Sequence, residues 1–474
     1  MEIFTDKNLN LHAVNEFFEN NLKIKNEIHC IKIIKDGKTA LAFAPNPYSL
    51  DDKREVYSMS KGFAATAVGI ACDMGIMSDE ERIVDIFPDK CPEKISDNLS
   101  EMKVKHLLSM NTGTEGCVMG NMWSSDDCVK AFLASDFKYK PGTHFSYNTG
   151  ATCMLSAIIE KKTGETIFDF ASEHLFFPLG IKMSKWNSVA DGTTEGGIGL
   201  HISCNDAAKI GELYLNNGVY NGKRILSEEW VKKASSPISD NSSNGSPDWC
   251  AGYGYQLWMN ANGGYRADGA YGQLCIILPE KDVVAAVLGR TADMQSEVTY
   301  VLNLIDGMYE NNPNDDGDIY FKSYPLIDKC EYKIMPFMNR WIHLKKNINN
   351  FTKMYITYED SDLAVYFTDG ERHQRLSAGN GRFVRSSFVA KWRKPKLIGI
   401  MQAAKCETVH FASCFGFDGD TLKILMRSTD NPAAETMSVF EENGKMKIVT
   451  TSIMLEPEEE DTFLVPEARE LYEI

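Results

Sequence analysis

The sequence lacks an excess of positive charge. Its 50 lysines and arginines stand against 66 aspartates and glutamates, which gives a formal net charge of −16. Nucleic acids and anionic membranes bind clustered lysine and arginine, so this balance argues against both as partners. The remaining composition, 43% hydrophobic and 24% charged, is that of an ordinary globular protein.

Long apolar runs are also missing. No stretch approaches the roughly 18 uninterrupted apolar residues that a membrane helix needs. The most apolar segment, Phe63 to Met77, is shorter and contains Asp73. The first residues, Met1 to Lys7, have neither the basic start nor the apolar run of a signal peptide. We therefore expect a cytoplasmic protein with no membrane partner.

Metal-ligand and disulfide patterns are absent as well. The twelve cysteines form no Cys-x-x-Cys pair, and Cys72, Cys153 and Cys275 lie inside apolar segments. The nine histidines show neither His-x-x-x-His spacing nor a cluster with cysteine. In a chain this large, the pattern predicts reduced core thiols rather than a disulfide framework. Nothing argues for a metal, and we expect no cofactor.

The length of 474 residues is enough for two domains. Residues 311–318 are polar and turn-forming, as linkers are. Directly before them, apolar residues share one helical face at Val298, Val301, Leu302, Ile305, Met308 and Tyr309. We predict a first domain at residues 1–310, a linker at 311–320, a second domain at 321–455 and an acidic tail at 456–474.

The first domain mixes strand and helix patterns. Residues 31–35 and 40–43 flank Asp36-Gly37, a typical β-hairpin turn. Residues 64–74 predict a buried helix that Gly75 ends. Two further strands are expected at 274–278 and 283–288. Strands at both ends of a helix-rich middle indicate an α/β (α+β) domain, with a sheet assembled from both extremities and flanked by helices.

Alternating apolar residues dominate the second domain. One strand face is indicated by Leu363, Val365 and Phe367 before an Asp369-Gly370 turn. The pattern recurs from Val409 to Phe415, and again on both sides of Asn443-Gly444. About 130 residues of short strands and tight turns are typical of an all-β barrel, such as a lipocalin-like one, or of a sandwich.

The first chemical motif is a serine three residues before a lysine. Ser58 and Lys61 lie at the opening of the predicted helix, on one helical face. Unsatisfied N–H groups at a helix start favour an oxyanion beside Ser58. Lys61 can take the serine proton if burial lowers its pKa. In the alternative reading, Ser58 only caps the helix and Lys61 points into solvent.

Further motifs follow in a fixed order. After Ser58-Met59-Ser60-Lys61 come residues 104–113 with His106-Leu107-Leu108, residues 141–150 with Tyr147, the Pro178-Leu179-Gly180 turn, and Gly269-Ala270-Tyr271-Gly272-Gln273. Over residues 25–310 the chain thereby resembles the serine β-lactamase, penicillin-binding protein and esterase superfamily. The resemblance is to its class C-like branch of bacterial serine hydrolases, which includes D-aminopeptidases. It implies a β-lactamase-like fold for the first domain.

The resemblance also implies roles for individual residues. Ser58 would be the nucleophile, and Lys61 and Tyr147 the general acid and base. The backbone N–H groups of Ser58 and Ala270 would form the oxyanion hole. Substrate-binding positions would be Asn148, Thr149, Asp268 and Gly269. The small β domains of related peptidases border the active site or mediate assembly, which leaves a homo-oligomer open.

Two positions depart from the family pattern. The second motif often reads Tyr-x-Asn, whereas here Thr149 holds the third position and the asparagine is Asn148. The third motif usually begins with lysine or histidine, but here it reads Ala267-Asp268-Gly269. On a strand, the side chain of Arg266 should face away from that of Ala267. An acid in this motif should repel anionic substrates, which argues against a native role on β-lactams.

Several functions stay open at this point. The leading hypothesis is hydrolysis of a small ester or amide through a Ser58 acyl-enzyme. If Asp268 faces the pocket it could hold a substrate ammonium, which would favour a D-amino-acid peptidase or amidase acting on a short peptide. A third hypothesis is a non-catalytic penicillin-recognising or scaffold protein. Fold alone does not choose among them.

Overall fold

The computed structural model describes residues 1–182, 184–310, 319–321, 324, 326–344, 350–391, 406–442 and 445–452. Two compact units emerge from it. The larger comprises Glu2–Ala44 with Leu50–Ile319, and the smaller Met1, Pro45–Ser49 and Tyr320–Ile474. The expected polar segment 311–318, the Asn443-Gly444 turn and the acidic tail lie outside the described residues. The boundaries of the linker therefore stay a prediction.

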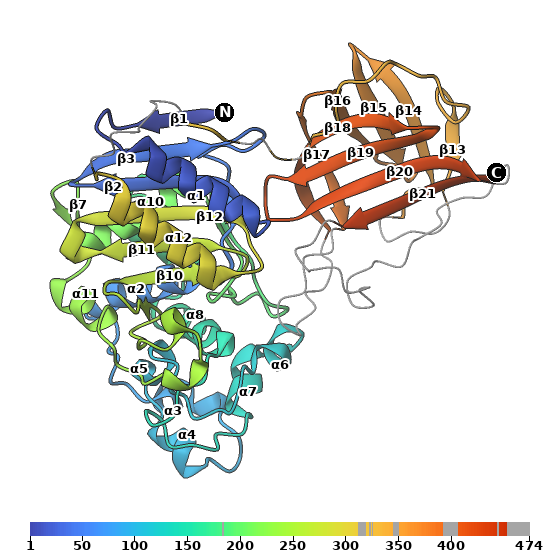
Figure 1. Cartoon of the computed structure of the whole chain (residues 1–474). Helices are drawn as coiled ribbons and strands as arrows, with labels where there is room; N and C mark the ends of the chain where they lie inside the picture. Colours follow the sequence, from blue (N-terminus) through green and yellow to red (C-terminus); the bar gives the residue numbers. More distant parts are fainter. Residues whose placement is uncertain are drawn as a thin grey trace. The chain divides into compact units, whose positions relative to one another are not determined.

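A seven-stranded sheet forms the centre of the larger unit (Figure 1). Every neighbouring pair in it is antiparallel. Its order is β1 (Glu2–Thr5), β3 (Lys38–Ala44), β2 (Glu27–Lys35), β12 (Val283–Arg290), β11 (Gln273–Leu278), β10 (Tyr265–Gly269) and β9 (Trp258–Met259). Because β2 pairs with β12, the two ends of the domain meet in one sheet, and this prediction is confirmed.

The predicted turns of this sheet have the expected backbone. Asp36 and Gly37 both adopt positive φ, at 50° and 69°, between β2 and β3. A two-residue hairpin turn needs this conformation, and Asp-Gly adopts it at low cost. The predicted strands at 274–278 and 283–288 are β11 and β12. The predicted hairpin and strands are therefore confirmed.

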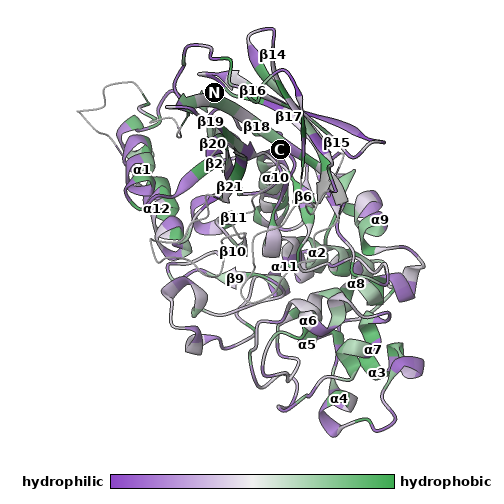
Figure 2. Cartoon of the chain, turned by 90° about the vertical axis from the view of Figure 1, so that its right-hand side faces the viewer, coloured by the Kyte–Doolittle hydropathy of each residue, from purple (hydrophilic) through white to green (hydrophobic). Residues whose placement is uncertain are grey.

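Helices cover both faces of the sheet. Figure 2 shows α1 (Leu11–Lys23) and α12 (Met294–Gly307) on one side and α10 (Cys204–Leu215) on the other. The predicted helix before the linker is α12, which buries Val298, Val301 and Ile305. Among the described residues, no helix combines the length and apolar character that crossing a bilayer requires.

A helical region adjoins the end of the sheet that carries β10 (Figure 1). At its centre are α2 (Ser60–Asp73), which is buried from Ser60 to Ala71, and α8 (Thr149–Thr163). Gly75, at φ 72°, follows the end of α2, as predicted. The other helices here are α3 (Ile83–Ile86), α4 (Asp97–Glu101), α5 (Val104–Leu108), α6 (Met119–Trp123), α7 (Cys128–Leu133), α9 (Ile167–Ala171) and α11 (Glu228–Ala234).

Short strands complete the larger unit. One small sheet has the order β4 (Arg54–Glu55), β6 (Leu200–Ile202) and β5 (Lys185–Trp186). A second pairs β7 (Val219–Tyr220) with β8 (Lys223–Arg224). Pairing of β4 with β6 brings the chain before Ser58 beside the chain after Gly197. Ser58 and Gly197 are thereby held in the same part of the domain.

The smaller unit is a curled nine-stranded sheet (Figure 1). An all-β second domain was predicted, and this is confirmed. Its described strands are β13 (Trp341–His343), β14 (Lys353–Glu359), β15 (Asp362–Thr368), β16 (His373–Asn380), β17 (Val384–Lys391), β18 (Cys406–Asp418), β19 (Thr421–Ser428), β20 (Ala434–Glu442) and β21 (Lys445–Ser452). Inward-facing residues such as Leu363, Val365, Phe411 and Val439 form its core.

Candidate active site

Ser58 lies in a single 3₁₀ turn, Tyr57–Met59, directly before α2. The sequence placed it at the first residues of the helix, whereas α2 begins at Ser60. Tyr57 adopts φ 46°, a left-handed conformation that is costly for a bulky residue. Tyr57, Met59 and Ser60 are buried, but Ser58 is partly exposed. The turn therefore presents the Ser58 hydroxyl at the surface of the site.

Ser60, the other serine of the motif, has a structural role. Its hydroxyl donates to the Tyr57 carbonyl and accepts a hydrogen bond from the Leu200 N–H at 3.2 Å. Ser60 is fully buried. It thus ties the turn to β6 and does not reach solvent. Of the two serines, Ser58 has the hydroxyl that a substrate can approach.

Lys61 is buried, with only 1% of its surface exposed. Its Nζ donates to Ser58 Oγ at 3.0 Å, to Thr149 Oγ1 at 3.2 Å and to the Gly197 carbonyl at 2.8 Å. The helix start has no side-chain cap. The alternative in which Ser58 caps the helix and Lys61 points into solvent is therefore wrong.

The three partners also orient the lysine when it is neutral. A neutral amine has two N–H donors and one lone pair. The Gly197 carbonyl can only accept a hydrogen bond, and the Thr149 hydroxyl is placed to accept the second. The remaining lone pair then faces the Ser58 hydroxyl. This geometry suits a base that takes the serine proton.

The electrostatics support the same role. Burial lowers the pKa of Lys61 to about 7, while nearby Cys117 and Asp268 act in the opposite direction. Removing a cation from water penalises the charged form, so burial favours the free amine. A large fraction of Lys61 is then uncharged near neutral pH. Such a lysine can act as a general base.

Tyr147 lies against both groups. Its phenol lies beside Ser58, which opposes the rise in the phenol pKa described below, and Lys61 Nζ lies 4.8 Å from its ring centroid. The ring stacks on Trp258, with centroids 5.2 Å apart, and meets Tyr253 edge-on at 6.2 Å. Burial, and secondarily Asp268, raises the pKa of the phenol well above its usual value. Tyr147 is therefore a protonated phenol beside Ser58.

Gly269 brings the end of β10 against the serine turn. A Cβ atom at Gly269 would collide with the Val56 carbonyl and lie 3.1 Å from the Ser58 nitrogen. Only glycine permits this approach. Ala270 follows and begins the turn to β11. The two backbone N–H groups predicted for the oxyanion hole thus belong to segments in direct contact.

The two polar residues after Tyr147 have different surroundings. The side chain of Asn148 is fully buried and caps α8, accepting from Gly150 N at 2.9 Å and Val118 N at 3.1 Å. It also donates to Thr114 Oγ1 at 3.1 Å. Asn148 therefore serves the fold, and its substrate-binding role stays a prediction. Thr149, whose hydroxyl contacts Lys61, is the polar group at the site.

Asp268 is buried, with 6% exposed, and is paired with Arg266 on the same strand face. Its Oδ2 lies 3.1 Å from the guanidinium of Arg266, which is itself fully buried. Ala267 faces the other way, 3.2 Å from where a Cβ of Gly62 would lie, as strand alternation predicts. The negative charge of Asp268 is therefore matched within the protein and is not free for a substrate ammonium.

The sequence did not predict the contact of Lys61 with the loop at residues 196–199, in which the Gly197 carbonyl accepts a hydrogen bond from Lys61 Nζ. A Cβ on Gly197 would lie 2.8 Å from Thr149 Cγ2, so the loop packs directly on α8. Gly196 and Gly199 adopt positive φ on either side. Three glycines within four positions are the signal that could have found it, because backbone approaching this closely requires residues without side chains.

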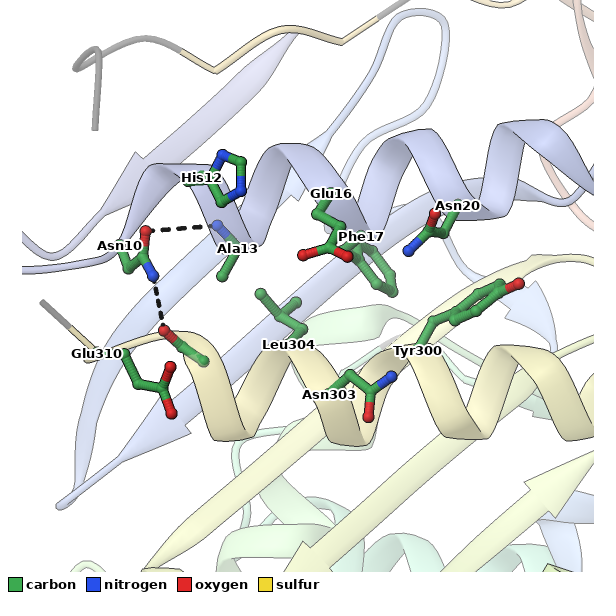
Figure 3. A pocket seen from close by; sticks show the side chains of 11 residues that line it. Asn10, His12, Ala13, Glu16, Phe17, Asn20, Tyr300, Asn303, Leu304 and Glu310 are labelled. Atoms are coloured by element: carbon green, nitrogen blue, oxygen red, sulfur yellow. Dashed lines mark hydrogen bonds between the residues drawn. The ribbon is translucent and has the colours of Figure 1, made fainter. Parts of the chain in front are cut away.

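A groove lies between α1 and α12 (Figure 3). Its volume is about 240 Å³. Asn10 closes one end by donating to the Gly307 carbonyl at 2.9 Å. Its lining includes His12, Glu16, Tyr300 and Asn303, but none of the predicted catalytic residues. This groove is therefore separate from the candidate active site.

A partly exposed serine, a buried lysine and a phenol lie together at the edge of a helix-flanked antiparallel sheet, as in serine hydrolases of the β-lactamase-like fold. The model of the beta-lactamase family matches residues 30–301. This covers more than half of the chain, and the chain belongs to this family. This membership, together with the contact of Ser58 and Lys61, favours a serine hydrolase over the scaffold hypothesis.

Individual relatives are distant. The chain is 26% identical over 167 residues to a D-aminopeptidase of Brucella anthropi, covering 33% of this chain and 32% of that protein. It is 23% identical to a 6-aminohexanoate-dimer hydrolase of Paenarthrobacter ureafaciens, covering 53% and 68%. The chain thus spans about a third of the length of the first relative and two thirds of the second.

A solved structure extends over both units. The octameric penicillin-binding protein homologue from Pyrococcus abyssi matches with a TM-score of 0.51 and 16% identity. The match covers 92% of this chain and 97% of that one. At this identity it establishes the fold and nothing about the reaction.

Proposed function

We propose that the chain hydrolyses a small ester or amide through an acyl-enzyme on Ser58, with Lys61 and Tyr147 as proton-transfer groups. One observation carries the proposal. Lys61 Nζ lies 3.0 Å from Ser58 Oγ, and burial lowers its pKa to about 7. A serine hydroxyl needs such a neighbouring base to become a nucleophile.

The reaction begins with attack of Ser58 Oγ on the substrate carbonyl carbon, while its proton moves to Lys61. The carbonyl oxygen becomes an oxyanion that accepts hydrogen bonds from the Ser58 and Ala270 N–H groups. When the C–O or C–N bond breaks, Tyr147 protonates the leaving group and regains a proton from Lys61. A water molecule then attacks the acyl carbon by the reverse proton transfers and frees Ser58.

The charges of the site favour a neutral substrate. The third motif lacks the lysine or histidine that would pair with a carboxylate, and Asp268 is neutralised by Arg266. This motif therefore has no unpaired charge that would attract a carboxylate or an ammonium group of a substrate. A neutral ester, or an amide without a carboxylate beside the scissile bond, fits these residues best.

Amide or peptide cleavage is the second candidate. It is supported by the likeness to a D-aminopeptidase and to a 6-aminohexanoate-dimer hydrolase. A leaving amine needs protonation more than a leaving alcohol does, and the protonated phenol of Tyr147 beside Ser58 suits that task. D-aminoacyl substrates therefore belong in any test beside esters.

The test combines a substrate panel with mass spectrometry. p-Nitrophenyl esters, D- and L-aminoacyl p-nitroanilides and nitrocefin are compared for turnover, and the intact protein is weighed after exposure to each. We expect an acyl adduct that maps to Ser58, and its loss in Ser58→Ala. Ser60→Ala is the matched control and should still form the adduct. An adduct on Ser60, or none with any acylating agent, would disprove the mechanism.

A further inference from the structure

We infer that Gln273 positions the Ala270 N–H of the oxyanion hole. The inference rests on the proposed function, since it assigns a task within the same reaction. Gln273 does not contact the reacting atoms. It acts through the turn between β10 and β11, whose first residue is Ala270.

The contacts of Gln273 are concentrated on that turn. Its side chain is fully buried. The Nε2 group donates to the Ala270 carbonyl at 3.3 Å, to the Tyr271 carbonyl at 3.0 Å and to the Gly289 carbonyl of β12 at 3.0 Å. One carboxamide thus joins two successive turn carbonyls to the neighbouring central strand.

The turn needs such support because its backbone is strained. Tyr271 and Gly272 both adopt left-handed conformations, at φ 65° and 82°. This conformation is costly for tyrosine, and the surrounding contacts must supply the compensation. Besides Gln273, the Thr291 N–H donates to the Tyr271 carbonyl at 3.1 Å. Without these bonds the turn would relax towards ordinary backbone angles.

The orientation of the carboxamide follows from its partners. Three carbonyl oxygens can only accept hydrogen bonds, so the NH₂ end of Gln273 must face them. Gly269 pairs with Gln273 across the hairpin, which holds the strand end before Ala270. Gln273 Nε2 holds the Ala270 carbonyl on the other side of this residue. The direction of the Ala270 N–H group is thereby fixed. An oxyanion hole depends on donors preorganised in this way.

The experiment uses the full-length protein with two substitutions, Gln273→Met and Gln273→Glu. Methionine keeps the length of the side chain but donates no hydrogen bond. Glutamate keeps the shape, but its carboxylate faces three carbonyl oxygens. The readouts are kcat and KM for a p-nitrophenyl ester and for its thionoester, in which sulfur replaces the carbonyl oxygen, and the Tm of each variant.

A matched control exists in Gln256. This glutamine is also buried and donates from Nε2 to the carbonyls of Leu107 and Leu108, at 3.0 and 2.8 Å. Its bonds do not involve the turn at Ala270. Gln256→Met should lower Tm as Gln273→Met does, but leave the ratio of oxoester to thionoester turnover unchanged.

We expect Gln273→Met to lower kcat for the oxoester roughly 10-fold or more, with KM changed less than about 2-fold, since misplaced oxyanion donors weaken only the transition state. The preference for the oxoester over the thionoester should fall, because sulfur gains little from those donors. Gln273→Glu should recover activity relative to wild type at acidic pH, where its protonated carboxyl can donate again.

Three results would overturn the inference. An unchanged oxoester preference in folded Gln273→Met would leave Gln273 a structural residue only. If Gln273→Met does not fold, an unchanged oxoester preference in folded Gln273→Glu, measured above the pKa of its new carboxyl, has the same meaning. A wild-type protein that forms no acyl-enzyme on Ser58 would overturn the proposed function as well, so the two failures are distinguishable.

Discussion

Lys61 Nζ lies 3.0 Å from Ser58 Oγ at the start of a fully buried helix segment. The same nitrogen also contacts the Gly197 carbonyl and the Thr149 hydroxyl. The lysine is therefore shared between the nucleophile and two distant parts of the chain. Two carboxyl groups of the same domain, those of Asp268 and Glu297, are also buried.

Removal of either proton-transfer group should disable the enzyme. We expect Lys61→Met and Tyr147→Phe each to lower kcat by roughly 10²-fold or more, because each removes a partner in proton transfer. The double variant should be little worse than either single one, since catalytic groups act as a unit. Steady-state kinetics on the best ester measures this. Near-normal turnover in one variant would remove that residue from the mechanism.

The rate should depend on the protonation of Lys61. Only the neutral amine can accept the serine proton, and the pKa of Lys61 is lowered to about 7. For a neutral ester, kcat/KM should therefore rise with pH and reach half its maximum near pH 7. Because the charge of Asp268 raises the pKa of Lys61, Asp268→Asn should move the midpoint to lower pH. A profile that is flat between about pH 5 and 9 would contradict this assignment.

Asp268→Asn should also destabilise the protein. It leaves the fully buried guanidinium of Arg266 without its carboxylate. Breaking a buried pair in this way costs about 3–5 kcal/mol. The double variant Arg266→Met/Asp268→Leu removes both charges and should recover much of the loss. Urea denaturation of the three proteins checks the order, and equal stability of the single variant and wild type would refute it.

The preference for anionic or neutral substrates should also change in Asp268→Asn. In Asp268→Asn, the positive charge of Arg266 is no longer balanced, so anionic substrates should gain relative to neutral ones. The measurement is the ratio of kcat/KM for nitrocefin to that for p-nitrophenyl butyrate. We expect a higher ratio in the variant. An unchanged ratio would mean that this ion pair does not influence the substrate.

Glu297 should make stability fall as pH rises. Its carboxyl is fully buried on α12 beneath Gly272, and burial, reinforced by Asp293, raises its pKa well above the usual value. Above about pH 4.3, the unfolded chain releases this proton while the folded chain keeps it. The folded state therefore loses stability with rising pH until the folded pKa is reached.

The isosteric variant Glu297→Gln removes this titration. Its Tm relative to wild type should increase between about pH 4 and pH 8. Glu16→Gln, a change at an exposed glutamate of α1, is the control for the lost charge and should show no comparable trend. Scanning calorimetry across this range measures the difference. A Tm difference that is constant with pH would exclude a protonated Glu297.

Much of the fold followed from local patterns. The Asp36-Gly37 turn, the strands β11 and β12 and the helix α12 depend on neighbouring residues, and the structure confirms them. The role of Asn148 was not predictable in this way. Its position beside Tyr147 suggested a substrate contact, but its partners Val118 and Thr114 lie some thirty residues away in the sequence.

The sequence by itself indicated that Ser58 and Lys61 meet, because a three-residue spacing places both side chains on one face of a helical turn, although Ser58 lies in a 3₁₀ turn just before α2. Only the tertiary structure decided what the lysine does there. Its pKa depends mainly on the exclusion of water, and its orientation depends on Thr149 and Gly197, which are 88 and 136 residues away in the chain. Likewise, Arg266 neutralises Asp268 only because the fold buries both. The protonation state of a group, and the distance over which its charge acts, depend on its surroundings, and folding assembles those surroundings.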